Sequence, residues 1–310
     1  MTEISNATRF LHAIELGLGA WQWGDRVMWG YGASYNDKDI RDVFDVSLSQ
    51  GIRFIDTAEI YGSGRSERLL GQFLKETDQP ILIATKYFPW PWRLTKRSLP
   101  SALKGSLNRI GVETVDLYQI HWPSPIVSQE RMMEGMVECV KQGMTRTVGI
   151  SNFGQTRMLR AYSTLAQHGI PLASNQVHYS LLTREVEKNG TLARCKELGI
   201  RLIAYSPLEK GLLTGKYSPE KPPPGVRSQQ YAELLKKINP LLKLMTEIGQ
   251  DHGGKTNAQV ALNWLIWKGA LPIPGAKNAK QALENDGGAG WKLTDEQVAK
   301  LDEMTDEIHK

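Results

Sequence analysis

Four side chains able to move or stabilise a proton follow three short apolar runs of this 310-residue chain. Asp56 ends the run in RFIDTAEIYG, Tyr61 comes just after it, Lys86 ends PILIATK, and His121 ends VDLYQIH. In a barrel of parallel strands the carboxyl ends meet around one mouth. An acid, a phenol, an amine and an imidazole would therefore converge there on a single reacting atom.

The chemistry of these four groups is complementary. A phenol has an ordinary pKa of ~10, and an ammonium at Lys86 would lower the pKa of Tyr61 by stabilising the phenolate. Asp56 would hold the charge of Lys86, and His121 would hydrogen-bond and orient a substrate oxygen. Such a group can protonate an oxygen on which negative charge develops, as when hydride adds to a carbonyl carbon.

Each residue alone carries little information. A single histidine at a strand end is more often structural, and a single Asp–Lys pair is more often a fold-stabilising bridge. The joint pattern is stronger, because all four residues fall at the same face of consecutive predicted units.

Short β-type runs alternate with longer helical patterns along the whole chain. The strands are expected at residues 15–21, 53–58, 81–86, 115–121, 145–151, 173–179, 201–207 and 270–275, and helices include 39–51, 98–111, 131–143, 183–199 and 256–269. Eight such units predict an α/β fold of the (β/α)8 TIM-barrel class, a single domain over residues 1–310 with long βα loops at the C-terminal face. A doubly wound sheet is the alternative, but no GxGxxG follows the first strand.

Local signals mark where these helices stop and start. Several end in a glycine, which readily adopts the left-handed conformation that terminates a helix: Gly51, Gly111, Gly143, Gly199 and Gly269. The tail carries the amphipathic stretch KLTDEQVAKLDEM, with Thr294 as the expected N-cap.

The seventh unit contains SPEKPPPGVRSQQY (218–231), which is long for a βα connection. Long loops at this face of a barrel often close over a ligand, so we interpret the segment as a lid. A disordered insertion is the alternative.

Composition excludes several classes of partner. The net charge is +5, yet Lys and Arg are interleaved with Asp and Glu, so no basic stripe indicates nucleic-acid binding. No apolar run approaches the ~20 residues that span a bilayer, and MTEISNATRF does not resemble a secretory signal. Cys139 and Cys195 have no metal-like spacing, so we expect no metal site and a reducing, cytoplasmic location.

The motifs themselves resemble those of the aldo-keto reductase superfamily. Matching blocks cover nearly the whole chain in the family's order: GIRFIDTAEIYGSGRSERLLG, ILIATK, LYQIHWP, VGISNF, NQVHYSLL, AYSPLEKGLLTGKY and LPIPGAKNAKQALEN. The resemblance implies a catalytic tetrad of Asp56, Tyr61, Lys86 and His121. In it, Tyr61 is the general acid in reduction and the base in oxidation.

The resemblance also implies NADPH or NADP+ as cofactor, because side chains cannot supply hydride. Ser151, Asn152 and Gln176 would bind the nicotinamide carboxamide, and Tyr205 would stack on its ring. The pyrophosphate contacts would come from Ser206, Leu208, Gly211 and Lys216, in a Gly-containing loop that suits phosphate.

The adenosine end is expected at PIPGAKNAKQALEN. A helix N-terminus attracts anions, Lys277 adds a positive charge, and no acid precedes Glu284, which favours NADP(H) over NAD(H). Gln281, Glu284 and Asn285 resemble the family's adenosine-side contacts, although many members carry Arg at the position of Gln281.

Aromatic residues surround the expected mouth: Trp21, Trp23, Tyr87, Trp90, Trp92 and Trp122. Aromatic walls favour apolar carbonyl substrates and exclude water. Trp23 and Trp122 lie nearest the motifs and are the predicted substrate contacts.

The residues and the resemblance together predict an NADPH-dependent reductase of aldehydes or ketones that acts on a small carbonyl compound. The resemblance further implies a monomer, as most barrel reductases of this size are. A second hypothesis is an NADP(H)-binding redox-sensing module, since potassium-channel β subunits resemble this cofactor segment. A barrel enzyme of unrelated chemistry, such as an isomerase, is a third.

Overall fold

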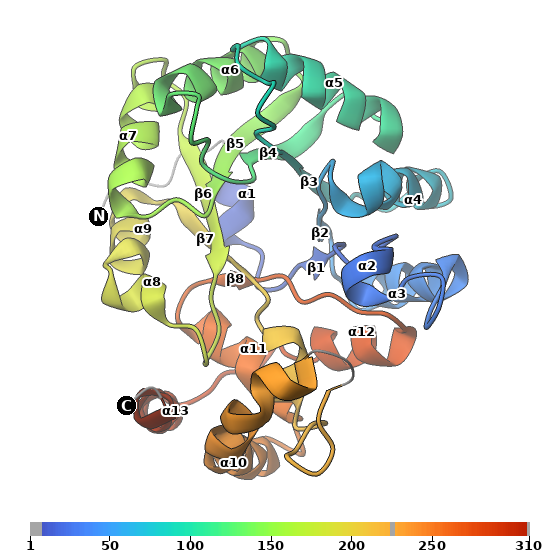
Figure 1. Cartoon of the computed structure of the whole chain (residues 1–310), viewed down its shortest axis with the longest axis vertical. Helices are drawn as coiled ribbons and strands as arrows, with labels where there is room; N and C mark the ends of the chain where they lie inside the picture. The colour runs from blue at the N-terminus through green and yellow to red at the C-terminus, as the bar shows by residue number, and fades with distance from the viewer. Residues whose placement is uncertain (1–7, 224–226, 309–310) are drawn as a thin grey trace.

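The computed structural model describes residues 8–223 and 227–308. Its centre is one eight-stranded sheet whose strands are all parallel and lie side by side in chain order (Figure 1). The strands are β1 (Leu18–Gly19), β2 (Phe54–Asp56), β3 (Leu82–Tyr87), β4 (Val115–Ile120), β5 (Thr145–Ser151), β6 (Leu172–His178), β7 (Arg201–Tyr205) and β8 (Leu271–Pro272).

The last strand closes on the first. The N–H groups of Gly17 and Gly19 donate to the carbonyls of Pro272 and Pro274, each at 3.0 Å. A Cβ on Gly19 would lie 2.7 Å from the carbonyl oxygen of Ile273, so glycine permits the close approach of the two strands. The predicted (β/α)8 barrel is confirmed.

Helices follow the strands and surround the barrel (Figure 1). They are α3 (Asp37–Ser49), α4 (Arg65–Leu74), α5 (Ser98–Ile110), α6 (Gln129–Lys141), α7 (Gln155–Ala166), α9 (Thr191–Leu198), α11 (Asn257–Trp267) and α12 (Ala279–Asp286). Further elements are α1 (Arg9–His12), α2 (Arg26–Trp29), α8 (Glu185–Lys188), α10 (Arg227–Asp251), α13 (Asp295–Ile308) and the 3₁₀ turns η1 (Tyr61–Gly64) and η2 (Glu209–Thr214). Within the two described ranges, no helix has the length and apolar character to span a membrane.

The predicted helix boundaries are largely correct. The five glycines expected to end helices all have positive φ: Gly51 (90°), Gly111 (81°), Gly143 (70°), Gly199 (67°) and Gly269 (80°). The Thr294 hydroxyl accepts from the N–H of Gln297 at 3.1 Å, as expected of an N-cap. The stretch 183–199, expected as one helix, breaks at Gly190, whose φ is 76°.

The segment interpreted as a lid is partly helical. Residues 224–226 lie outside the described residues, and α10 begins at Arg227 and runs for 25 residues with Pro240 inside it. Buried Leu235, Ile238, Leu241 and Met245 form one apolar stripe along it, and α10 packs on α11 and α13 (Figure 1). The Pro-rich start of this segment obscured the helical pattern behind it.

The barrel interior changes from apolar to polar along the strands. Leu11 of α1 packs with Phe54, Ala84, Leu117 and other strand residues in a buried apolar cluster. Two residues further along β2, β3 and β4, on the same face, stand Asp56, Lys86 and Gln119. Because side chains alternate along a strand, this step of two places polar groups at the carboxyl end.

Candidate active site

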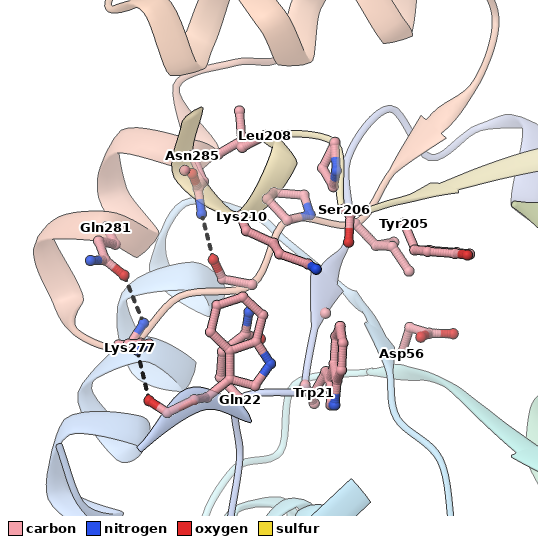
Figure 2. A pocket seen from close by; sticks show the side chains of 18 of the residues that line it. Trp21, Gln22, Asp56, Tyr205, Ser206, Leu208, Lys210, Lys277, Gln281 and Asn285 are labelled. Carbon is pink, nitrogen blue, oxygen red and sulfur yellow. Dashed lines mark hydrogen bonds between the residues drawn. The ribbon is translucent and has the colours of Figure 1, made fainter. Parts of the chain in front are cut away.

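A cavity of about 710 Å³ opens at the carboxyl ends of the strands. Figure 2 shows Asp56 and Tyr205 at one end, Lys277 and Gln281 at the other, and Ser206 and Lys210 between them. All the residues predicted to bind cofactor line this one cavity: Ser151, Asn152, Gln176, Tyr205, Ser206, Leu208, Gly211, Lys216, Lys277, Gln281, Glu284 and Asn285. Asp56, Tyr61, His121 and Trp122 also line it, while Lys86 lies buried behind them.

The ammonium of Lys86 connects the candidate catalytic residues. It donates to the carboxylate of Asp56, to the carbonyl of Thr57 at 2.8 Å and to the hydroxyl of Tyr61 at 3.3 Å. An ammonium has three N–H donors, so all three are engaged. The expected Asp–Lys–Tyr contact is therefore present.

Two buried glutamines complete the environment of Asp56. Its Oδ2 accepts from Nε2 of Gln119 at 3.1 Å and from Nε2 of Gln176 at 2.8 Å. Gln119 was not among the predicted site residues, although it lies two positions before His121 in the same apolar run. These bonds hold the carboxylate in place, and they engage the amide nitrogen of Gln176.

The pKa of Tyr61 shifts opposite to the sequence-based expectation. Burial raises the pKa of the phenol well above its usual value, and the charge of Asp56 raises it further. Burial also lowers the pKa of Lys86, although Asp56 opposes that change. The expectation of a lowered phenol pKa is therefore wrong, because removal from water, together with the charge of Asp56, disfavours the phenolate. Tyr61 retains its proton at neutral pH.

His121 is held as a neutral imidazole. Burial lowers its pKa well below the usual value, and the nearby charge of Lys86 adds to the effect. Its ring contacts that of Tyr61 edge to face, with centroids 5.6 Å apart. Both rings line the cavity, so a substrate oxygen placed between them would face a phenol and an uncharged imidazole.

Beside these residues, the side chains of Ser151, Asn152 and Tyr205 are joined by hydrogen bonds. Asn152, at φ 63°, donates to the carbonyl of His121 and to the hydroxyl of Ser151, both at 3.0 Å. The Tyr205 hydroxyl donates to Oδ1 of Asn152 at 3.0 Å, and His178 stacks on its ring at 5.3 Å. The Tyr205 ring is thereby fixed in orientation where it meets the cavity.

The loop after β7 has an unusual backbone. Ser206 (φ 51°), Glu209 (47°) and Lys210 (52°) are non-glycine residues with positive φ, and Gly211 follows at 93°. Such conformations cost about 1–3 kcal/mol each and persist only where the surroundings enforce them. Successive N–H groups in such turns can form a concave anion site.

Glu209 anchors this loop. Its Oε1 accepts from the hydroxyls of Ser180 and Thr183, each at 2.7 Å, and lies 2.7 Å from Nε2 of His178. Burial would raise the pKa of Glu209, but these partners, led by His178, keep it below its usual value. The carboxylate therefore compensates for part of the backbone strain.

At the far end, Lys277 precedes α12. Its Nζ donates to the carbonyl of Trp29 at 2.8 Å and lies over the rings of Trp29 and Tyr35, at 5.3 and 5.1 Å. Its N–H donates to Oε1 of Gln281 at 3.0 Å. Trp29 belongs to α2, so the segment between β1 and α3 reaches across to the end of the cavity where Lys277 lies.

Sequence reasoning missed several lining residues. Lys210 and Lys280 add to the cations of the cavity, and Gln22 and Trp29 come from the β1–α3 segment. Buried Oε1 of Gln22 and Nε1 of Trp29 have no hydrogen-bond partner among the described residues. The tryptophan-rich sequence WQWGDRVMWGYG was a signal, but its spacing did not reveal which indoles face inward.

The prediction for Trp23 is wrong, while Trp122 does line the cavity. Trp23 is fully buried, packs edge to face on Phe44 and Phe73, and does not line the cavity. Trp21 lies instead on the cavity wall, stacked on Tyr61 with ring centroids 6.2 Å apart. Because the chain turns at Ala20–Gly24, these two nearby indoles point to opposite sides.

Asp286, the last residue of α12, gives a testable pH dependence. Burial raises its pKa to about 7 from 3.8, and the nearby Ser47 hydroxyl only partly opposes this. Between these two values the unfolded chain releases the proton first, so stability falls as pH rises. We expect Asp286→Asn to raise the melting temperature at pH 8 more than at pH 5, as measured by calorimetry. The control is exposed Asp78→Asn, and equal shifts at both pH values would contradict the assignment.

The fold and the cavity define an α/β-barrel protein with a buried acid–base cluster at its mouth. The family model described as the Aldo/keto reductase family matches residues 15–306, and the chain belongs to this family. It is 40% identical to the chloroplastic pyridoxal reductase of Arabidopsis thaliana, over 95% of this chain and 84% of that protein.

Solved structures agree with this membership. The glycerol dehydrogenase of Gluconobacter oxydans has a TM-score of 0.83 at 26% identity, covering 94% of this chain and 91% of that one. An aldo-keto reductase of Klebsiella pneumoniae in complex with NADPH has a TM-score of 0.74 at 25% identity, covering 94% and 90%. Family membership supports an oxidoreductase function.

Proposed function

We propose that this protein is an NADPH-dependent reductase of aldehydes or ketones. One observation carries the proposal: a protonated Tyr61 hydrogen-bonded to Lys86 lies beside a neutral His121 at the mouth of a large cavity. We further propose that it acts on small carbonyl compounds as a monomer, which rests on the family resemblance, and in the cytoplasm, which rests on its two free cysteines.

The cavity fits a nicotinamide dinucleotide in size and in chemistry. Its volume falls within the 300–1,000 Å³ typical of ligand sites. Four lysines line it, namely Lys210, Lys216, Lys277 and Lys280, a set suited to phosphates. The unpartnered polar atoms of Gln22 and Trp29 would gain partners from a bound nucleotide.

Within that fit, each predicted residue has a distinct task. Ser151, Asn152 and Gln176 would hold the carboxamide, and Tyr205 would set the plane of the nicotinamide ring. The Ser206–Gly211 backbone with Leu208 and Lys216 would meet the pyrophosphate. Lys277, Gln281, Glu284 and Asn285 would meet the adenosine side.

When bound, NADPH would supply hydride to the carbonyl carbon. Tyr61 would then donate its proton to the carbonyl oxygen, giving the alcohol, and Lys86 would stabilise the phenolate left behind. His121 would hydrogen-bond the same oxygen and orient it. Asp56 would keep Lys86 charged despite burial.

The test is NADPH absorbance followed against a panel of aldehydes and ketones. Pyridoxal belongs in the panel because a relative at 40% identity is named pyridoxal reductase. Turnover above background on panel members is the expected result. Tight NADPH binding with negligible turnover on every carbonyl would instead support the redox-sensing module.

The preference for NADPH over NADH should depend on Lys277. Lys277→Glu replaces a cation by an anion where a 2′-phosphate would lie, and a hydrogen bond to a charged group contributes about 1.5–3 kcal/mol. We expect the KM ratio of NADPH to NADH to rise at least tenfold, measured with one carbonyl substrate.

Damage to the fold or to the contact with Trp29 should change the KM of both cofactors equally, so it does not affect the ratio of the two KM values. Lys292→Glu is the matched control, because it makes the same change of charge at an exposed lysine that does not line the cavity. A Lys277→Glu protein with equal changes for both cofactors would remove the proposed role.

A further inference from the structure

An unbroken series of aromatic rings leads outward from His121. The ring of Phe88 contacts that of His121 at 5.9 Å, and Trp90 contacts Phe88 at 4.6 Å. Trp92 stacks on Trp90 with centroids 5.1 Å apart and planes only 5° from parallel. The series Phe88–Trp90–Trp92, here called the aromatic ladder, thus begins at the candidate catalytic imidazole and ends at the protein surface.

The two indoles are not part of the core. Trp90 is 37% exposed and Trp92 is 71% exposed. Ordinary packing would bury such rings, since each carries a large apolar area. The neighbouring cavity wall is also open, because Trp122 lines the cavity and is itself 46% exposed.

The ladder is held rigidly in spite of this exposure. The N–H of Phe88 donates to Glu59 at 2.7 Å, and Arg93 donates to Glu59 at 2.9 Å and to the carbonyl of Phe88 at 2.9 Å. The guanidinium also lies 4.9 Å above the ring of Tyr87. These half-buried contacts of Glu59 and Arg93 tie down the loop that carries both indoles.

The same contacts also tie the ladder to the candidate catalytic loop. Glu59 lies between Asp56 and Tyr61, on the segment that presents the phenol. One carboxylate therefore sets the position of the ladder relative to Tyr61. A preformed aromatic surface at a fixed distance from a reacting centre loses little entropy when it binds a ligand.

We propose that the aromatic ladder is a substrate subsite for a flat aromatic group set apart from the reacting carbonyl. With the carbonyl oxygen at Tyr61 and His121, the first ring would lie by Phe88 and Trp122. Because Trp90 and Trp92 already stack on each other, a second, linked ring would pack against the exposed edge of Trp90 and the outer face of Trp92. The substrate class is an extended aryl aldehyde or ketone. This inference rests on the proposed carbonyl reduction.

A small molecule is the occupant favoured by the geometry. The exposed rings are continuous with the catalytic cluster through Phe88 and His121, whereas a protein-docking face has no need of that continuity. Stacking on an indole is worth up to about tenfold in affinity. Losing one indole should therefore weaken binding of the distal ring without disturbing the chemistry at Tyr61.

The test compares biphenyl-4-carboxaldehyde with benzaldehyde, which has no distal ring. For Trp92→Ala we expect the KM of the biphenyl aldehyde to rise about tenfold with little change in kcat. The KM of benzaldehyde should change far less. Trp92→Phe should restore most of the affinity, because a flat ring remains, and Trp90→Ala should match or exceed Trp92→Ala.

Leu94→Ala is the matched control. Leu94 is 46% exposed in the same loop but takes no part in the ring series, so both substrates should behave as with the wild-type protein. Equal KM changes for the two aldehydes in Trp92→Ala, or none for either, would overturn the subsite.

Binding is measured independently by calorimetry, with biphenyl-4-methanol and NADP+ present. If the wild-type protein reduces no carbonyl, the proposed function fails. Binding of the alcohol can still be measured, so it tests the aromatic ladder separately. Weaker binding in Trp92→Ala supports the subsite, and unchanged binding overturns it. A shift in sedimentation caused by Trp92→Ala, without any change in binding, would assign the ladder to an interface between copies and also overturn it.

Discussion

Replacing Tyr61 by Phe should reduce kcat for aldehyde reduction by about 10²–10⁴-fold, the usual contribution of a positioned proton donor. The substitution removes one hydroxyl and keeps the ring that stacks with Trp21 and contacts His121. The Lys86 ammonium loses only its 3.3 Å bond to that hydroxyl. NADPH affinity, measured by fluorescence titration, should therefore remain close to that of the wild-type protein.

Tyr217→Phe is the matched control, since Tyr217 lines the same cavity but does not contact Lys86. It should retain full turnover. Because burial keeps the pKa of Tyr61 high, the phenol is protonated across the neutral range. The reductive kcat should accordingly stay flat from about pH 6 to 9, well below even the ordinary tyrosine pKa of ~10. Substantial turnover by Tyr61→Phe would show that another group donates the proton.

Replacing Lys86 by Met should damage both stability and catalysis. Lys86 is fully buried and pairs with buried Asp56. Removing one partner of a buried ion pair costs about 3–5 kcal/mol, because the remaining charge is left uncompensated. We expect a melting temperature lower by several degrees in calorimetry, together with nearly complete loss of turnover.

The double variant Lys86→Met with Asp56→Asn separates the two effects. It removes both charges, while an asparagine oxygen can still accept from Gln119 and Gln176. Stability should return towards the wild-type value, and turnover should not. Lys104→Met, at an exposed position on α5, is the control and should be neutral in both measurements. A double variant that regained turnover would exclude Lys86 from the reaction.

The positions of the candidate catalytic residues could be predicted because they depend on local pattern. Asp56 and Lys86 end or nearly end apolar runs whose strands pair in parallel, so their side chains had to share one end of the barrel. The helix ends at Gly111 and Gly199 could be predicted as well, since a positive φ is a local requirement of the backbone that glycine meets.

Other features required distant contacts. Trp21 and Trp23 are the same type of residue two positions apart, so the sequence does not distinguish them. Trp21 nevertheless lines the cavity, while Trp23 packs on Phe44. Trp29 reaches Lys277 across 248 positions of sequence, and no spacing rule connects them. The helix α10 was missed because its apolar stripe follows a Pro-rich stretch that indicates a loop.

The sequence alone determined the order of strands and helices and the chemical types delivered to the mouth of the barrel. Both follow from alternation along strands, from helical periodicity and from glycine at helix ends. Only the tertiary structure decided how those groups behave. Burial, together with the charge of Asp56, raises the pKa of the Tyr61 phenol, whereas sequence reasoning had expected Lys86 to lower it. Desolvation is set by every neighbour in space, and most of those neighbours are far away along the chain.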